Sequence, residues 1–212
     1  MARGSGGTWT WGGGKSVFDL SLVDRVDPRM TSIVTSVLTA ASASVLVAPS
    51  GISLCRITRA HLQPALAIET ASYPADEAAD EEKLALRIAQ APEYFWGAFA
   101  GDVLRGFVCG TLTTATDLTD ESMSMHEPTG ETLCIHSVVV DAEHRRQGLA
   151  TWMLRSYIER VSELGVPKRI VLICKEYLLG FYESCGFGNR GPSDVVHGQD
   201  PWILMELTLK QE

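Results

Sequence analysis

Residues 133–154 read LCIHSVVVDAEHRRQGLATWML and change character twice along their length. The first part, 133–140, is apolar enough to form a buried strand. The next part, 143–148, begins with charged residues and ends at a glycine. A helix is expected from about residue 150 to 164, because apolar residues then recur with helical spacing. Its expected buried face consists of Ala150, Met153, Leu154, Tyr157, Ile158 and Val161.

The basic loop between this strand and this helix is a candidate anion site. The first N–H groups of a helix have no partner inside the helix, and the helix dipole adds about half a positive charge there. Gly148 allows close approach of an anion to the backbone, while Arg145 and Arg146 supply further donors and charge. These features suit a phosphate or pyrophosphate group. The alternative is an ordinary solvated loop that leads into a helix.

Two polar residues near this loop could take part in proton transfer. His136 lies within the strand, and Tyr182 lies in GFYESCGF, residues 180–187, where a short helix is expected. A histidine in a strand and a buried tyrosine are each more often hydrogen-bonded core residues, so this alternative stays open for both. Strict alternation along the strand would place four residues on one face: Cys134, His136, Val138 and Val140.

Hydrophobic patterns elsewhere predict strands and helices that interleave. Strands are expected at 52–57, 94–100, 104–113, 169–174 and 202–209. Helices are expected at 59–73, 80–91 and 177–185. In the first of these helices, Leu62, Leu66 and Ile68 are expected to help form the apolar stripe. Because hairpins occur beside strand–helix–strand units, the predicted fold class is α/β (α+β) with a mixed sheet.

The composition narrows the class of protein. A chain of 212 residues, 45% of them hydrophobic, can bury a sizeable core in one domain and still carry an extension. A formal net charge of −8 argues against a nucleic-acid surface as the main function. The five cysteines are scattered and lack a metal-binding spacing such as C-x-x-C. They are therefore expected to be reduced thiols of a cytoplasmic protein, and no metal is expected.

The beginning of the chain differs from the rest. Residues 1–50 are predicted to be a flexible or loosely ordered extension, and residues 51–212 the folded domain. The run 31–55 carries no charge, but serine and threonine interrupt it too often for a membrane-spanning helix of about 20 apolar residues. Its few acidic residues and many hydroxyls would also suit an organelle transit peptide, and this alternative stays open.

The sequence RRQGLA, residues 145–150, resembles the pyrophosphate loop Q/R-x-x-G-x-G/A of the GCN5-related N-acetyltransferases, the GNAT superfamily. Three longer stretches, 121–150, 171–187 and 191–198, resemble arylalkylamine N-acetyltransferases, the serotonin N-acetyltransferase group. The resemblance covers roughly residues 52–208. It implies the GNAT fold, in which a central mixed, mostly antiparallel sheet is flanked by helices.

The resemblance also implies acetyl-CoA as the cosubstrate. Its pyrophosphate would lie on the backbone of residues 146–151 and its pantetheine arm along residues 138–140. The N–H near Val138 would polarise the thioester carbonyl. The implied cofactor-binding residues are Val138, Val139, Val140, Arg145, Arg146, Gln147, Gly148, Leu149, Ala150 and Thr151.

The implied reaction is acetyl transfer to a primary amine by direct attack in a ternary complex. An alkylammonium has a pKa of about 10 and must lose a proton before it can attack. His136 is expected to accept this proton, and Tyr182 to donate a proton or hydrogen bond to the leaving thiolate. By the same resemblance, Tyr73, Ile173 and Trp202 would line the amine pocket.

The acceptor is expected to be an arylalkylamine of the serotonin, tryptamine or phenylethylamine type. Polyamines and protein lysine or N-terminal amines are alternatives, and a CoA-binding module without catalysis is a further one. The expected partner is thus a small primary amine, with no nucleic acid and no membrane, and the protein is expected to be a monomer.

The chain departs from the vertebrate enzymes of this group in two places. Cys134 replaces the first of two strand histidines, and a buried thiol is a poor base. Residues 73–82 lack a Cys-Pro-Leu segment, which favours a non-vertebrate type. The acidic run 76–82 is interpreted as a solvated helix start, with attraction of polycationic amines as the alternative.

Overall fold

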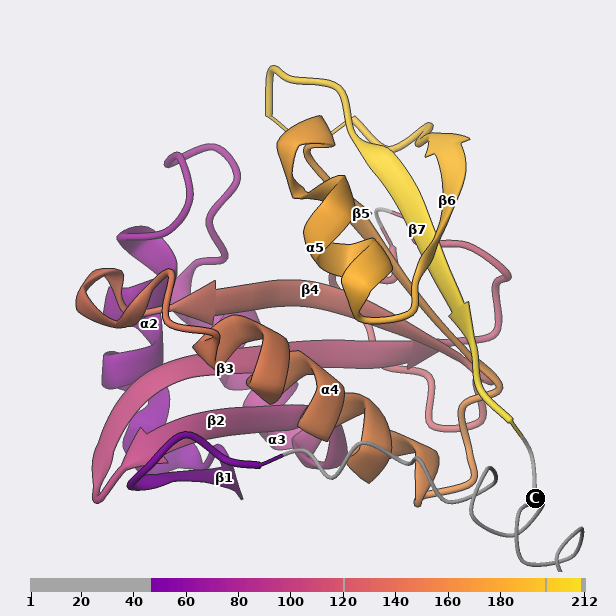
Figure 1. Cartoon of the computed structure of the whole chain (residues 1–212). Helices are drawn as coiled ribbons and strands as arrows, with labels where there is room; N and C mark the ends of the chain where they lie inside the picture. The colour runs from indigo at the N-terminus through magenta and orange to yellow at the C-terminus, as the bar shows by residue number, and fades with distance from the viewer. Residues whose placement is uncertain (1–46, 120, 197, 211–212) are drawn as a thin grey trace, which may run out of the picture. The chain divides into compact units, whose positions relative to one another are not determined.

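The structure, a computed structural model, describes residues 47–119, 121–196 and 198–210. Seven strands form one sheet in the order β1-β2-β3-β4-β5-β7-β6 (Figure 1). The strands are β1 Ile52–Arg56, β2 Phe95–Ala100, β3 Val103–Thr113, β4 Thr132–Val140, β5 Arg169–Cys174, β6 Gly188–Pro192 and β7 Ile203–Thr208. Neighbouring strands are antiparallel except β4 and β5, which are parallel. This confirms the predicted mixed, mostly antiparallel sheet. The predictions for residues 1–46 concern a segment outside the described residues.

Helices cover both faces of the sheet (Figure 1). The α-helices are α2 Leu62–Thr70, α3 Glu81–Gln90, α4 Leu149–Ser162 and α5 Leu179–Ser184. The short 3-10 helices are η2 Arg59–His61, η3 Pro92–Tyr94, η4 Ala142–His144 and η5 Glu176–Leu178. Residues of α4 and α5 share one hydrophobic cluster, and residues of α2 and α3 share another. The predicted helices flanking the sheet are thus confirmed.

Helix α2 turns its apolar residues toward the hydrophobic cluster that it shares with α3. Its buried residues are Leu62, Ala65 and Glu69, whereas Leu66 and Ile68 are only half-buried. Both still pack against the cluster of α2 and α3, which contains Leu62, so the expected apolar stripe is confirmed at all three positions. The last residue of the buried face is Glu69, whose carboxylate can be buried because it has hydrogen-bond partners inside the protein.

Strand β6 was not predicted. Its sequence, GNRGP, is mostly exposed and has neither β-branched nor aromatic residues. It forms because it pairs with β7 along an antiparallel register that local sequence does not encode.

The parallel pair at the centre of the sheet separates along its length. Strands β4 and β5 pair only over residues 132–134 and 169–171. Beyond Cys134, β4 continues to Val140 without a partner on that side, and Figure 1 shows the two strands diverging. Where the strands diverge, a cavity is lined by residues 138–140 of β4 and 173–174 of β5, and it forms an opening between the two strands.

Strand β4 also carries a β-bulge at His136. Cys109 of β3 pairs with Ser137, and Gly110 pairs with Ile135, so His136 is an extra residue without a register partner. Such an insertion shifts the alternation of side chains by one residue. Val140 and the partly buried Val138 pack in the α4 cluster with Leu133 and Ile135, while Val139 packs in the α2 and α3 cluster.

The bulge overturns one sequence prediction. His136 does not share a face with Val138 and Val140, because the extra residue reverses the side-chain direction between them. His136 and Ser137 consequently both face the side covered by α2 and α3.

Among the residues that the structure describes, no helix is long and apolar enough to cross a membrane. Four of the five cysteines, Cys109, Cys134, Cys174 and Cys185, are buried as free thiols, whereas Cys55 is exposed.

Candidate active site

The loop before α4 has a backbone shaped by two left-handed residues. Gly148 is the N-cap residue of α4, with φ 81° and ψ −3°. Arg146 has φ 62° and is the one non-glycine residue with positive φ in the described part of the chain. None of the described side chains caps α4, so the N–H groups of its first turn are available to a ligand.

Two loop side chains are used to hold the loop in place. Arg145 Nε donates to the Val140 carbonyl oxygen at 2.8 Å, and its guanidinium also donates to Ser72 Oγ at 3.0 Å. Gln147 Nε2 donates to the Glu143 carbonyl oxygen at 3.0 Å. The loop is therefore preorganised by Arg145 and Gln147, and its backbone amides and the exposed Arg146 side chain are donors for an anion.

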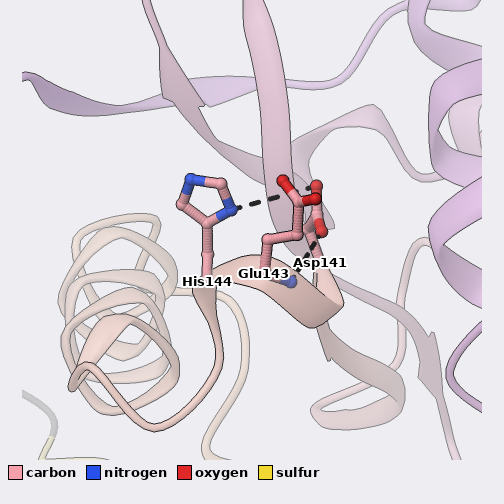
Figure 2. Close-up of side chains that lie close together, drawn as sticks. All are labelled: Asp141, Glu143 and His144. Carbon is pink, nitrogen blue, oxygen red and sulfur yellow. Dashed lines mark hydrogen bonds and ion pairs between the residues drawn. The ribbon is translucent and has the colours of Figure 1, made fainter.

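The turn that leads into this loop gathers Asp141, Glu143 and His144 (Figure 2). Asp141 Oδ1 accepts from the Glu143 N–H at 3.1 Å, and Asp141 Oδ2 lies 3.4 Å from Arg105 and 3.9 Å from His144 Nδ1. Both oxygens of Asp141 are thus engaged, one of them with a cation. We assign this cluster to capping η4 and fixing the direction in which the chain enters the loop.

Three cavities run from this loop to His136. The outer cavity has a volume of about 620 Å³ and is bordered by β4, the loop and α5. It brings together many of the predicted cofactor-binding residues: Val138, Val140, Arg145, Arg146, Gly148, Ala150 and Thr151. The side chains of the other three do not border it. Val139 packs in the cluster of α2 and α3. Leu149, the first residue of α4, is buried in the cluster of α4 and α5, and Gln147 bonds within the loop.

The inner cavity, of about 270 Å³, lies on the opposite face of the sheet. His136 borders it together with the three residues predicted for the amine: Tyr73, Ile173 and Trp202. Glu69 of α2 and Arg87 of α3 border it as well.

The middle cavity, of about 250 Å³, shares residues with both of the others. It has Tyr73, Ile173 and Trp202 in common with the inner cavity, and Val138 and Tyr182 in common with the outer one. The path therefore crosses the sheet where β4 and β5 diverge. Two ligands that enter from opposite faces can meet there.

His136 has a defined hydrogen-bonding state. Its Nε2 lies 2.7 Å from Thr111 Oγ1, and that hydroxyl donates to the Ser122 carbonyl oxygen at 2.7 Å. Since the hydroxyl has only one proton, Nε2 must be the donor to Thr111, which leaves the lone pair on Nδ1. Nδ1 is buried and has no hydrogen-bond partner among the described residues. Burial, aided by the positive charge of Arg87, lowers the pKa of His136 well below its usual value, so the ring is neutral at physiological pH.

Tyr182 is suited to keep its proton. Its side chain is buried, with Phe181 and Phe187 in edge contacts, and it borders the middle and outer cavities. Burial raises the pKa of its hydroxyl, so the phenol remains protonated and can act as a proton donor.

Lys175, which sequence reasoning missed, joins two loops over the inner and middle cavities. Its Nζ lies 2.7 Å from Glu77 Oε1 and 3.6 Å from Asp200, and 3.8 Å from the centre of the Trp202 ring. Glu77 is buried, so the interpretation of the acidic run as solvated was wrong for this residue. It holds for Glu81 and Glu82, which are exposed, while Asp80 caps α3 by accepting from the Lys83 N–H.

Comparison with known proteins agrees with this arrangement. The family model described as Acetyltransferase (GNAT) family matches residues 62–187. The chain is 32% identical over 119 residues to the serotonin N-acetyltransferase of Mesocricetus auratus; the match covers 56% of this chain and 58% of that protein. The chain thus spans little more than half the length of that curated relative.

Two solved structures share the fold at low sequence identity. The loading GNATL domain of CurA from Lyngbya majuscula has a TM-score of 0.69 at 15% identity and covers 74% of this chain and 98% of its own. Arabidopsis thaliana Naa50, in complex with the bisubstrate analogue CoA-Ac-MVNAL, has a TM-score of 0.59 at 18% identity, with 74% and 99% covered.

The divided central sheet, with a preorganised anion loop beside the opening, defines a protein of the GNAT fold. With a family model that matches residues 62–187, the chain belongs to the acetyltransferase (GNAT) family.

Proposed function

We propose that this protein transfers the acetyl group of acetyl-CoA to a primary amine, and that the amine is an arylalkylamine. The observation that carries the proposal is the path of three cavities from the amides of the loop to Nδ1 of His136. The similarity to a serotonin N-acetyltransferase supports the choice of amine. Five free thiols suit the reducing cytoplasm as the place of action.

In this proposal the two substrates occupy the two ends of the path. The CoA pyrophosphate binds the loop amides around Gly148, and the pantetheine arm follows Val138 and Val140 in the outer and middle cavities. The amine binds in the inner cavity beside Tyr73, Ile173 and Trp202. The thioester and the amine nitrogen then meet at the opening between β4 and β5, and their proximity supplies much of the rate enhancement.

Proton transfers follow from the states of two side chains. The neutral His136 accepts a proton from the ammonium at Nδ1, and the electron pair left on nitrogen attacks the thioester carbonyl carbon. The C–N bond forms, the C–S bond breaks, and Tyr182 donates its proton to the leaving thiolate; the Tyr182 phenolate then takes the second proton, which the nitrogen releases as the amide forms. The N–H near Val138 stabilises the negative charge on the carbonyl oxygen.

The direct test measures CoA release from acetyl-CoA with tryptamine, phenylethylamine, spermidine and a peptide with a free N-terminus. We expect the highest kcat/KM for tryptamine or phenylethylamine. Faster acetylation of the peptide than of every free amine would assign the protein to the acetyltransferases that act on protein N-termini. A folded protein that acetylates none of them would exclude the proposal.

Tyr182→Phe is expected to lower kcat about 100-fold while the KM for acetyl-CoA changes little, because the ring still packs and only the proton donor is lost. Steady-state kinetics at saturating tryptamine measure the effect. Tyr177→Phe is the control, since that hydroxyl is removed from an exposed residue of the outer cavity. Equal activity of Tyr182→Phe and the wild type would exclude Tyr182 as the donor.

Gly148→Ala is expected to raise the Kd for acetyl-CoA about tenfold, because its methyl group would stand where an anion approaches the loop amides. Without a ligand, this Cβ would meet no described atom within 4 Å, so the variant costs only the strain of a left-handed alanine, about 1–2 kcal/mol. Gly165→Ala at φ 67° also lies in open space, but beyond the far end of α4. The two variants should lose similar stability, and only Gly148→Ala should lose affinity. Equal Kd values would exclude the loop as the anion site.

A further inference from the structure

Glu69 is a buried carboxylate, and one of its two oxygens has no hydrogen-bond partner among the described residues. Only 1% of the residue is exposed. Oε1 accepts two hydrogen bonds, from the Ala79 N–H at 3.1 Å and from Ser137 Oγ at 2.9 Å. Oε2 is buried and has no hydrogen-bond partner in the described ranges. A buried carboxylate oxygen is rarely left unbonded, so its lack of a partner suggests a role for a ligand.

Glu69 and Glu77 are the carboxylates among the described residues that border the inner cavity. Glu77 is held by Lys175, as the 2.7 Å ion pair shows. Arg87 borders the same cavity, but its guanidinium donates to Cys109 Sγ at 3.7 Å and to the Met123 carbonyl oxygen at 3.2 Å. The oxygen of Glu69 is therefore the better placed of the two to receive a cation.

The carboxyl is tied to the proposed base. The bulge turns both His136 and Ser137 toward α2, and the Ser137 hydroxyl donates to Glu69. Oε2 of Glu69 and Nδ1 of His136 are thus two acceptors without described partners beside one cavity. A primary ammonium has three N–H donors and can satisfy both acceptors at once. Neither a hydroxyl nor a tertiary ammonium, with one donor each, can do so.

We infer that Glu69 binds the ammonium group of the amine substrate through Oε2 and directs it to His136. The identity of the ligand rests on the proposed function, whereas the acceptor site rests on Glu69 itself. Its substrate class is a primary alkylammonium, selected over neutral molecules of the same shape. Burial raises the pKa of Glu69, opposed by its two hydrogen bonds and the charge of Arg87, and an arriving cation further favours the ionised carboxylate.

The test compares the binding of tryptamine with that of tryptophol, in which a hydroxyl replaces the amine. Calorimetry in the presence of CoA gives both Kd values without any turnover. In the wild type we expect tryptamine to bind roughly 10- to 100-fold more tightly, the range for a charge-assisted hydrogen bond to a buried carboxylate. In Glu69→Gln, which keeps an oxygen for Ala79 and Ser137, this preference should fall to about threefold or less, while tryptophol binding is unchanged.

Other results would overturn the inference. Glu69 would have a purely structural role if the wild type did not prefer tryptamine, or if the preference persisted in Glu69→Gln. The same conclusion would follow if Glu69→Gln lost affinity equally for both ligands. If Glu69→Gln does not fold, Glu69→Asp serves instead: because it withdraws the carboxylate by one methylene, it should reduce the preference for tryptamine, and a preference equal to that of the wild type would exclude the ammonium site.

The binding assay separates this inference from the proposed function. If the protein prefers tryptamine through Glu69 but acetylates no amine, the ammonium site is supported and the proposed reaction is excluded. If the wild type acetylates tryptamine and Glu69→Gln keeps the binding preference for tryptamine, the proposed reaction is supported and the ammonium site is excluded.

Discussion

His136→Gln is expected to lower kcat/KM for the amine by about 10²- to 10⁴-fold, the usual contribution of a general base. The glutamine amide can still donate to Thr111, so the local hydrogen bond is replaced while the lone pair of Nδ1 is lost. Acetyl-CoA binding should be unchanged, because His136 does not border the outer cavity. Initial rates of CoA release, with calorimetry for acetyl-CoA, give the two quantities.

The pH dependence gives a second measurement on the same residue. Because burial and Arg87 lower the pKa of His136 well below 6.5, the base stays unprotonated at pH 6.5. The wild type should lose the contribution of this base only as the pH falls further, through the lowered pKa, and His136→Gln should lack that step. His126→Gln is the matched control: burial also lowers the pKa of His126, but it bonds the Leu112 N–H and does not border the inner cavity. Similar losses in both variants would contradict the role of His136.

Lys175→Met is expected to destabilise the protein by about 3 kcal/mol and to raise the KM for the amine. Removing one member of a buried ion pair leaves the other charge in a poorly solvated site, here Glu77 with a side chain only 5% exposed. The cation–π contact with Trp202 is lost at the same time, which loosens a wall of the inner cavity. Denaturant unfolding measures the stability, and amine kinetics measure the KM.

Two further variants identify the cause. The double variant Lys175→Met/Glu77→Leu should recover most of the lost stability, since the buried charge of Glu77 is then removed together with that of Lys175. Lys168→Met breaks the ion pair with Glu131, in which both side chains are more than half exposed, and should change stability by less than about 1 kcal/mol. A loss from Lys175→Met as small as that from Lys168→Met would contradict this account.

The features that sequence predicted well are local ones. The strand, basic loop and helix of residues 133–164 follow from apolar runs and one glycine, and the structure has them as β4, η4 with its loop, and α4. Tyr73, Ile173 and Trp202 are far apart in sequence and could be placed near one cavity only through the family resemblance. Their roles remain predictions.

The features that sequence missed depend on contacts between distant segments. The bulge at His136 arises from the register between β3 and β4, which alternation within β4 cannot reveal. Glu69 and Arg87 appear as ordinary polar residues of two helices, and only the packing of those helices against the sheet makes them buried neighbours of a cavity. The role of Lys175 likewise depends on its ion pair with Glu77 and its cation–π contact with Trp202, which belong to two other loops.

The extra residue in β4 limits how this protein can be redesigned by exchange with its relatives. A donor strand of equal length that lacks the extra residue would place the side chains after position 136 on the opposite face, exchanging the lining of the outer cavity for that of the inner one. A chimera should therefore take residues 132–140 together with the paired segment of β3 as one block. Conversely, deleting His136 should leave Ser137 to Val140 in their register with β3 and on their present faces, because the deleted residue is itself the insertion.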